Sequence, residues 1–168
     1  MWHGALLLLL FAPALVAQTQ YGSAAKPGAT RPMTHTRTGC PWLTEGSAAH
    51  ALGGDVSVTA DVSDMGEGIC RFARKQGSTD FMEILVSKAG LPACPPGSVA
   101  LKGIGNEALT CRHGESRGDS VEMINSRVRD FHFTVTLTVR GQKGSSKSDD
   151  PQNDALEQVA EQIAGNLY

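Results

Sequence analysis

The sequence predicts an α+β protein with one antiparallel sheet of about six strands, a short helix before the sheet and a longer helix after it. Two observations carry this prediction. Segments between residues 55 and 140 alternate apolar and polar side chains with a period of two, which is typical of strands with one buried face. Thr44 and Gly53, in contrast, are typical of the two ends of a helix, and Asp150 and Pro151 are typical of the start of another.

The N-terminus predicts export. The apolar run from Ala5 to Ala17 (ALLLLLFAPALVA) has the length of a signal-peptide core and is too short to span a bilayer. Residues 12–14 (APA) offer an A-x-A cleavage site and residues 15–17 (LVA) a looser one, and no cysteine lies near them to carry a lipid. We therefore expect a signal peptide over 1–17, a periplasmic or secreted location, and no stable membrane insertion after signal removal.

The rest of the chain predicts a flexible tether over residues 18–39 and a single α+β domain over 40–168. The tether sequence is rich in Gly, Pro, Ser and Thr and poor in large aliphatic residues. The formal net charge is -2, with acidic and basic residues interspersed, so no basic surface for nucleic acid is expected.

The four cysteines, Cys40, Cys70, Cys94 and Cys111, predict two disulfides. An even number in an exported chain favours disulfides, and the C-x-x-C spacing of many metal sites is missing. Three pairings are possible. We favour Cys40 with Cys70 and Cys94 with Cys111, because each closes a moderate loop between neighbouring elements. The expected role is structural, without redox chemistry.

The first half of the domain predicts one helix and three strands. Thr44 is a plausible N-cap for a helix that stops at Gly53. Strands are expected over 56–62, 69–75 and 81–86. The third (FMEILV) is almost continuously apolar, which favours a central position covered on both faces.

The second half predicts a Pro-rich crossover, three more strands and a helix. Residues 87–105 contain Pro92, Pro95 and Pro96, which fit neither a long helix nor a regular strand, although one helical turn is compatible with them. Residues 106–112 and 120–128 are expected to form a hairpin around a polar loop, 113–119. The final helix begins at Pro151 and carries an apolar stripe of Leu156, Val159, Ile163 and Leu167.

The clearest strand, residues 131–140, predicts a binding surface. One of its faces is apolar, and the other is a row of threonines with a histidine at one end and an arginine at the other. The expected binding surface is His132, Thr134, Thr136, Thr138 and Arg140.

The segment CPWLTEGSAAHALGG, followed by the strand that contains Cys70, resembles the opening of an exported bacterial family of uncharacterised function that includes actinobacterial cell-envelope lipoproteins. In that pattern a cysteine precedes a Leu-Thr-x-x-x-Ala-x-x-x-Leu-Gly helix and pairs with a later strand cysteine. The segments GIGNEAL, RVRDFHFTV and ALEQVAEQIAGNLY are similar to small exported proteins of soil bacteria.

This resemblance spans about residues 39–168 and implies an α+β fold like that of the PsbP photosystem subunit and the sensor domains of some mycobacterial receptor kinases. It implies no catalytic residues. The chain departs from the lipoprotein members because it has no lipobox cysteine, and its middle helix is reduced.

Four short motifs suggest a function, but each has a structural explanation. Residues 114–118 fit G-x-S-x-G, but the alternating strands and helices of serine hydrolases are missing around them. The tripeptide 117–119 (RGD) and the loop 103–106 (GIGN) consist of common turn residues. Asp130 and His132 could form a carboxylate and imidazole pair, although Asp beside a turn usually caps backbone amides. The histidines show no metal-ligand spacing, so no metal or cofactor is expected.

Two functions follow from the sequence. The first is a non-catalytic binding or sensing module for a small molecule, a glycan or an envelope protein. The alternative is a small secreted hydrolase using Ser116 or His132, which requires a histidine within hydrogen-bond reach of the serine.

Overall fold

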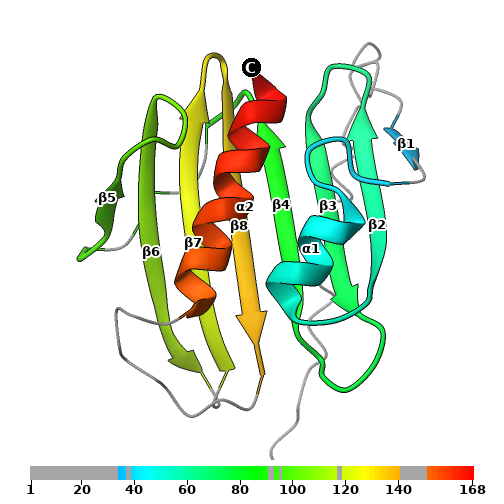
Figure 1. The fold of residues 1–168 in the computed structure, drawn as a ribbon. Helices are drawn as coiled ribbons and strands as arrows, with labels where there is room; N and C mark the ends of the chain where they lie inside the picture. Colours follow the sequence, from blue (N-terminus) through cyan, green and yellow to red (C-terminus); the bar gives the residue numbers. More distant parts are fainter. Residues whose placement is uncertain (1–33, 37–38, 91–92, 95, 117–118, 141–150) are drawn as a thin grey trace, which may run out of the picture. The chain divides into compact units, whose positions relative to one another are not determined.

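One antiparallel sheet of eight strands organises the fold, in the order β1-β2-β3-β4-β8-β7-β6-β5 (Figure 1). The computed structural model describes residues 34–36, 39–90, 93–94, 96–116, 119–140 and 151–168. All of these belong to one unit, Pro32–Tyr168. The predicted signal peptide, most of the predicted tether and the segment 141–150 lie outside the described residues.

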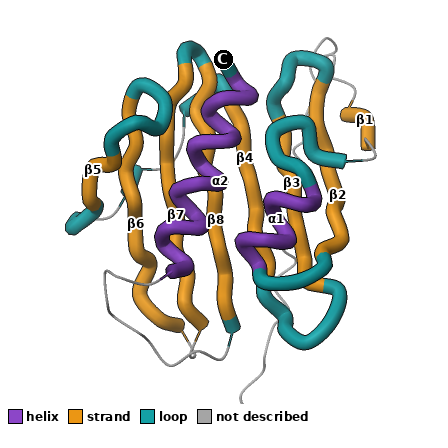
Figure 2. Tube along the Cα trace, viewed as in Figure 1, coloured by secondary structure: helices purple, strands orange, loops and turns teal. Residues whose placement is uncertain are grey.

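Along the chain, the described elements are β1 (Thr34–Thr36), α1 (Glu45–Leu52), β2 (Val56–Ser63), β3 (Gly68–Arg74), β4 (Phe81–Ser87), β5 (Val99–Leu101), β6 (Glu107–Ser116), β7 (Asp119–Val128), β8 (Phe131–Val139) and α2 (Pro151–Leu167). Figure 2 shows the same elements by type. The predicted α+β class with one antiparallel sheet and flanking helices is confirmed, with more strands than the six expected.

Both helices pack on the same face of the sheet (Figure 1). Helix α1 contacts β2, β3 and β4, whereas α2 contacts β7 and β8, and the two helices contact each other. Asn166 of α2 donates a hydrogen bond to the carbonyl oxygen of Trp42, just before α1, at 2.9 Å. Together the helices cover the middle of the sheet on one side.

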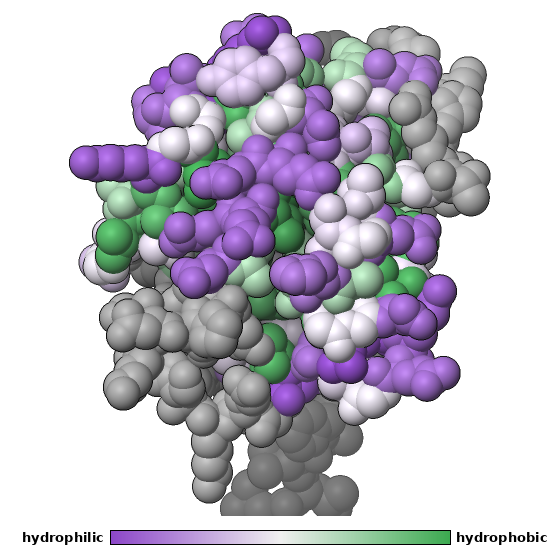
Figure 3. Space-filling model, viewed as in Figure 1, coloured by the Kyte–Doolittle hydropathy of each residue, from purple (hydrophilic) through white to green (hydrophobic). Residues whose placement is uncertain are grey.

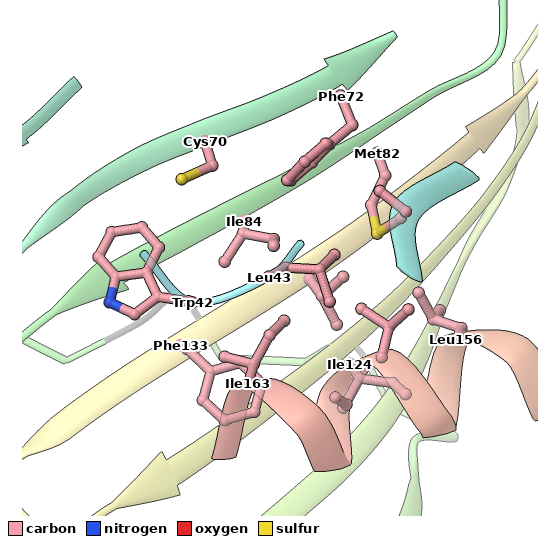
Figure 4. Close-up of a cluster of buried hydrophobic side chains, with 14 of the residues drawn as sticks. Trp42, Leu43, Cys70, Phe72, Met82, Ile84, Ile124, Phe133, Leu156 and Ile163 are labelled. Carbon is pink, nitrogen blue, oxygen red and sulfur yellow. The ribbon is translucent and has the colours of Figure 1, made fainter. Parts of the chain in front are cut away.

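The core fills the space between the helices and the sheet (Figure 4). Alternate strand residues point into it, as the period of two predicts. The largest fully buried side chains include Phe72, Phe133, Leu43, Met82 and Ile84. The predicted stripe of α2 is also in the core, with Leu156, Val159 and Ile163 buried and Leu167 packed against it.

Helix α1 has the caps that the sequence predicts. The Thr44 side chain accepts a hydrogen bond from the Ser47 backbone N–H at 3.1 Å, which satisfies one of the free amides of the first turn. Gly53 ends the helix in the left-handed region, at φ 70°, where a residue with a Cβ is strained.

The structure adds two strands of three residues that the sequence did not reveal. Strand β1 lies within the segment predicted to be a tether and pairs with the end of β2. Strand β5 lies within the Pro-rich middle, where one helical turn was considered, and pairs with β6. A strand of three residues is too short to show a period of two, so backbone pairing with a longer neighbour defines each one.

Two further expectations need correction. Strand β4 is central, but Leu85 on its outer face is 38% exposed, so the strand is not covered on both faces there. Strand β6 runs to Ser116 and β7 starts at Asp119, so the predicted loop 113–119 is largely strand. Backbone pairing of the two strands extends almost to the turn despite the polar sequence.

The surface on the helix side is mainly hydrophilic (Figure 3). Hydrophobic side chains show at the β5 and β6 edge in that view, and Val99 of β5 is 60% exposed. The helices are amphipathic: their apolar faces pack on the sheet and their polar faces are turned to solvent.

The disulfides join Cys40 to Cys70 and Cys94 to Cys111, the pairings favoured from the sequence, each with Cα atoms 5.7 Å apart. Cys70 is fully buried on the helix face of β3. The first disulfide therefore attaches the segment before α1 to the core.

We expect the double variant Cys40→Ala, Cys70→Ala to lose about 3–4 kcal/mol of unfolding free energy, because the cross-link restricts a loop of 30 residues in the unfolded chain. Urea unfolding of the oxidised wild type and variant measures this loss. After reduction the two proteins should unfold at nearly the same urea concentration. Equal stabilities in the oxidised state would contradict a stabilising role.

Candidate functional site

A cavity of about 510 Å³ lies against the face of the sheet that is turned away from the helices. Gly90, Ala93 and Cys94, from the segment between β4 and β5, form one wall. Leu109, Asn125 and His132, from β6, β7 and β8, are among the residues of the opposite wall. In the view of Figure 1 the helices lie in front of the sheet, so the cavity is behind it.

The sheet order explains why the cavity exists. Strand β4 ends at Ser87 and β5 begins at Val99, but β8, β7 and β6 lie between them in the sheet. We call the described residues between these strands, 88–90, 93, 94 and 96–98, the crossover. The crossover reaches the far edge of the sheet on the face that the helices leave free. The Cys94–Cys111 disulfide attaches it to β6 there.

Across the floor of the cavity, side chains stand in rows set by the strand register. Glu107 is opposite Arg127, and Arg127 is opposite His132. We call these three residues the polar row. Residues that are directly opposite in an antiparallel pair have Cβ atoms about 4.5–5.5 Å apart, so their side chains are neighbours on one face.

The polar row holds one ion pair and one free imidazole. Arg127 Nη2 lies 2.6 Å from Glu107 Oε1, and the two side chains are 40% and 73% exposed. His132 is half-buried, and its ring makes no hydrogen bond with any residue that the structure describes. This end of the cavity therefore offers polar groups that are incompletely satisfied by the protein.

The next row is structural. Thr134 donates to Asn125 Oδ1 at 2.7 Å, and Asn125 Nδ2 donates to the sulfur of Cys94 at 3.4 Å. Leu109, opposite Asn125 on β6, is 39% exposed and lines the cavity. Asn125 thus links the sheet to the crossover beside the disulfide, and Leu109 presents an apolar surface between them.

The five predicted surface residues have different environments. Of these, His132 lines the cavity, whereas Thr136 is half-buried and Arg140 is exposed. Thr134 and Thr138 are only 7% and 8% exposed, so the threonine row is not an open polar face. Flanking strands explain this burial, because Thr134 lies between Leu85 and Asn125 in the register.

Arg140 interacts at the opposite end of β8 from His132. Its backbone N–H donates to Asp80 Oδ1 at 2.9 Å, and its Nε lies 3.9 Å from Asp119 Oδ2. These contacts hold the end of β8 to its neighbours. The predicted surface is therefore divided between a cavity residue, buried threonines and an edge contact.

Sequence reasoning missed Leu109, Asn125 and Arg127. All three lie on the same face of the sheet as Cys111, which is bonded to the crossover. The signal was present, because a disulfide from Cys94 to Cys111 requires the crossover to pass over that face. Alternation from Cys111 to Leu109 would then have identified the first wall residue.

The register separates Ser116 from His132. Ser116 pairs with Asp119, and the next residue of β7, Ser120, pairs with Val139 at the end of β8. His132 lies seven residues before Val139, near the other end of β8. At about 3.3 Å per residue this is about 23 Å along the strand. The pair lies far beyond hydrogen-bond reach. The side chain of Ser116 lies outside the described residues.

Asp130 lies in the two-residue turn between β7 and β8, next to Arg129 at φ 54°. The structure contains no hydrogen bond between Asp130 and His132 among its described residues. Within the same residues no group of three His, Cys, Asp or Glu side chains is placed to hold a metal ion. None of the described helices is long and apolar enough to cross a membrane.

Comparisons of the chain with protein-family models, with curated proteins and with solved structures found no significant match. The resemblance to the exported bacterial family stays a prediction.

The bend at residues 102–106 positions the polar row. The Asn106 N–H donates to the Arg127 carbonyl oxygen at 2.7 Å, and Asn106 Oδ1 accepts from the Arg129 N–H at 2.9 Å. Gly105 has φ 61°, and a Cβ there would lie 2.6 Å from the Arg127 carbonyl oxygen. The close approach of this bend to β7 therefore requires glycine.

We expect Gly105→Ala to destabilise the protein more than Gly103→Ala. Both glycines have positive φ, so each alanine carries a conformational cost of about 1–2 kcal/mol. A Cβ at Gly103 meets nothing within 4 Å, whereas the one at Gly105 pushes against β7, which adds at least about 1 kcal/mol. Urea unfolding of both variants measures the difference, and equal losses would contradict the close packing of the bend.

Proposed function

We propose that this chain is an exported, non-catalytic binding module that takes a small molecule into the cavity between the crossover and the sheet. The observation that carries the proposal is the composition of the cavity. Leu109, Ala93 and Ala100 supply apolar surface, and a few polar groups lie at the polar row. Small-molecule sites are typically concave and mostly apolar with a few well-placed polar groups.

The size of the cavity and the way its walls are held support this proposal. Ligand sites commonly measure about 300–1,000 Å³, and the cavity is within this range at about 510 Å³. One wall consists of the paired strands of the sheet. The crossover, which forms the other wall, is linked to β6 by a disulfide and to Asn125 by a hydrogen bond. A ligand would therefore meet walls that are already formed.

The proposed location follows from the covalent structure. Two disulfides indicate an oxidising environment, which exported proteins encounter. The predicted signal peptide over 1–17 gives the route. A glycan or an envelope protein remains a candidate occupant for the same face.

The alternative of a hydrolase that uses Ser116 or His132 has less support. A serine nucleophile needs a base within hydrogen-bond reach, and about 23 Å of strand separates Ser116 from His132. The side chain of His113, the other histidine considered as the base, lies outside the described residues. His132 could still act on a bound ligand without Ser116. The binding proposal needs no such step, so we prefer it.

A thermal-shift screen with two matched variants tests the proposal. Leu109→Trp fills the cavity, and Leu85→Trp places the same ring on the same face outside it, at a leucine of almost equal exposure, 38% against 39%. A compound present at a concentration 100 times its dissociation constant for the wild type should raise the free energy of unfolding by about 2.7 kcal/mol. We expect Leu85→Trp to keep this response and Leu109→Trp to lose it.

Two results would overturn the proposed function. Compounds that stabilise both tryptophan variants equally would place the binding site elsewhere. A hydrolytic activity of the oxidised protein that disappears in Ser116→Ala would show catalysis. Thermal unfolding of each variant without compound shows whether both variants are folded before their responses to compounds are compared.

A further inference from the structure

The cavity has two chemically different ends. Leu109 and Ala100 are opposite each other on β6 and β5 and make the apolar end. Arg127 and His132 belong to the adjacent row, toward the turn between β7 and β8. A ligand that satisfies both ends would have an apolar body and one polar head.

Two residues with hydrogen-bond donors are cross-strand neighbours on the polar row. Arg127 has five N–H donors in a planar fork, and Glu107 is its polar partner among the described residues. The imidazole of His132 stands directly opposite Arg127 on the adjacent strand and is free of hydrogen bonds to the described residues. An oxygen between them can accept from both side chains at once.

The ion pair at this end carries no net charge, so hydrogen-bond donors decide between an anionic and a cationic head group. Glu107 is 73% exposed and is held by Arg127, so water solvates much of its carboxylate. Arg127 is less exposed, at 40%, and its fork matches the geometry of a carboxylate. Asn125 is not free to compete, because Thr134 and Cys94 already occupy its side chain.

We propose that the cavity takes an apolar carboxylic acid, with its carboxylate bound by Arg127 and His132 and its apolar body along Leu109. This inference rests on the proposed function, because it names the ligand class of the same cavity. No covalent step is involved. Neutral and cationic compounds of the same length provide the comparison.

Calorimetric titration of the oxidised protein with octanoate, 1-octanol and octylammonium tests the head group. We expect octanoate to bind at least tenfold more tightly than the other two, because hydrogen bonds to charged groups discriminate strongly. Arg127→Gln should weaken octanoate by about tenfold or more and leave 1-octanol unchanged. His132→Phe, which keeps a ring but no donor, should weaken octanoate by a smaller factor.

Arg71→Gln is the matched control. Arg71 lies on the same face of the sheet, on β3, where it stacks on Phe81 at 4.0 Å and does not line the cavity. We expect this variant to bind octanoate like the wild type. Equal weakening by Arg71→Gln and Arg127→Gln would overturn the assignment, because a diffuse charge effect would then explain it.

The other outcomes separate this inference from the proposed function. Binding of 1-octanol or octylammonium as tight as that of octanoate, and lost in Leu109→Trp, would overturn the carboxylate assignment and leave the cavity as a binding site. If none of the three compounds binds, the carboxylate assignment fails. The proposed function fails as well if the compound screen also finds nothing that depends on Leu109.

Discussion

The pairing of β4 with β8 is the constraint on which the rest of the structure depends. It joins strands that are far apart in the sequence, with Phe81 opposite Thr138 and Ser87 opposite His132. Strands β5 to β8 form a meander that reaches β4 from the opposite edge of the sheet, so the chain after Ser87 has to travel to that edge before the meander can begin. The helices cover one face. The crossover takes the other face, and the cavity under it is a consequence of this topology.

The two disulfides act on opposite faces of the same sheet. Cys70 points into the core with Phe72 and Ile84, whereas Cys111 shares the outer face with Leu109. Each cross-link attaches a segment that crosses a face of the sheet. The Cys40 side joins the start of the domain to the hydrophobic core, where burial already contributes stability. The Cys94 side joins the crossover to the face that the helices leave free, where Asn125 also donates a hydrogen bond to the Cys94 sulfur.

The sequence predicted the regular elements better than the site. A period of two identified the six longer strands, and capping residues identified both helices, because these signals depend on near neighbours in the chain. Strands β1 and β5 were missed because three residues carry no period and their existence depends on pairing with β2 and β6. The prediction of the binding surface was incomplete for a related reason. Alternation tells which residues share a face of β8, but Thr134 and Thr138 are buried by their neighbours on β4 and β7, which only the register reveals.

The rigidity of the cavity is therefore unequal on its two sides. Arg127 and His132 stand on central, fully paired strands, and the bend at Asn106 holds the backbone of Arg127 from the side. Their backbone positions are set when the sheet folds, so a ligand in the proposed site would meet strands that are already ordered. The described residues of the crossover are held at separate points: the Lys88 N–H donates to Glu67 Oε1 at 2.6 Å, and Cys94 is bonded to Cys111 and accepts a hydrogen bond from Asn125. In the proposed site, the sheet would select the head group, whereas entry and retention of a ligand would depend on how firmly Lys88 and Cys94 hold the crossover.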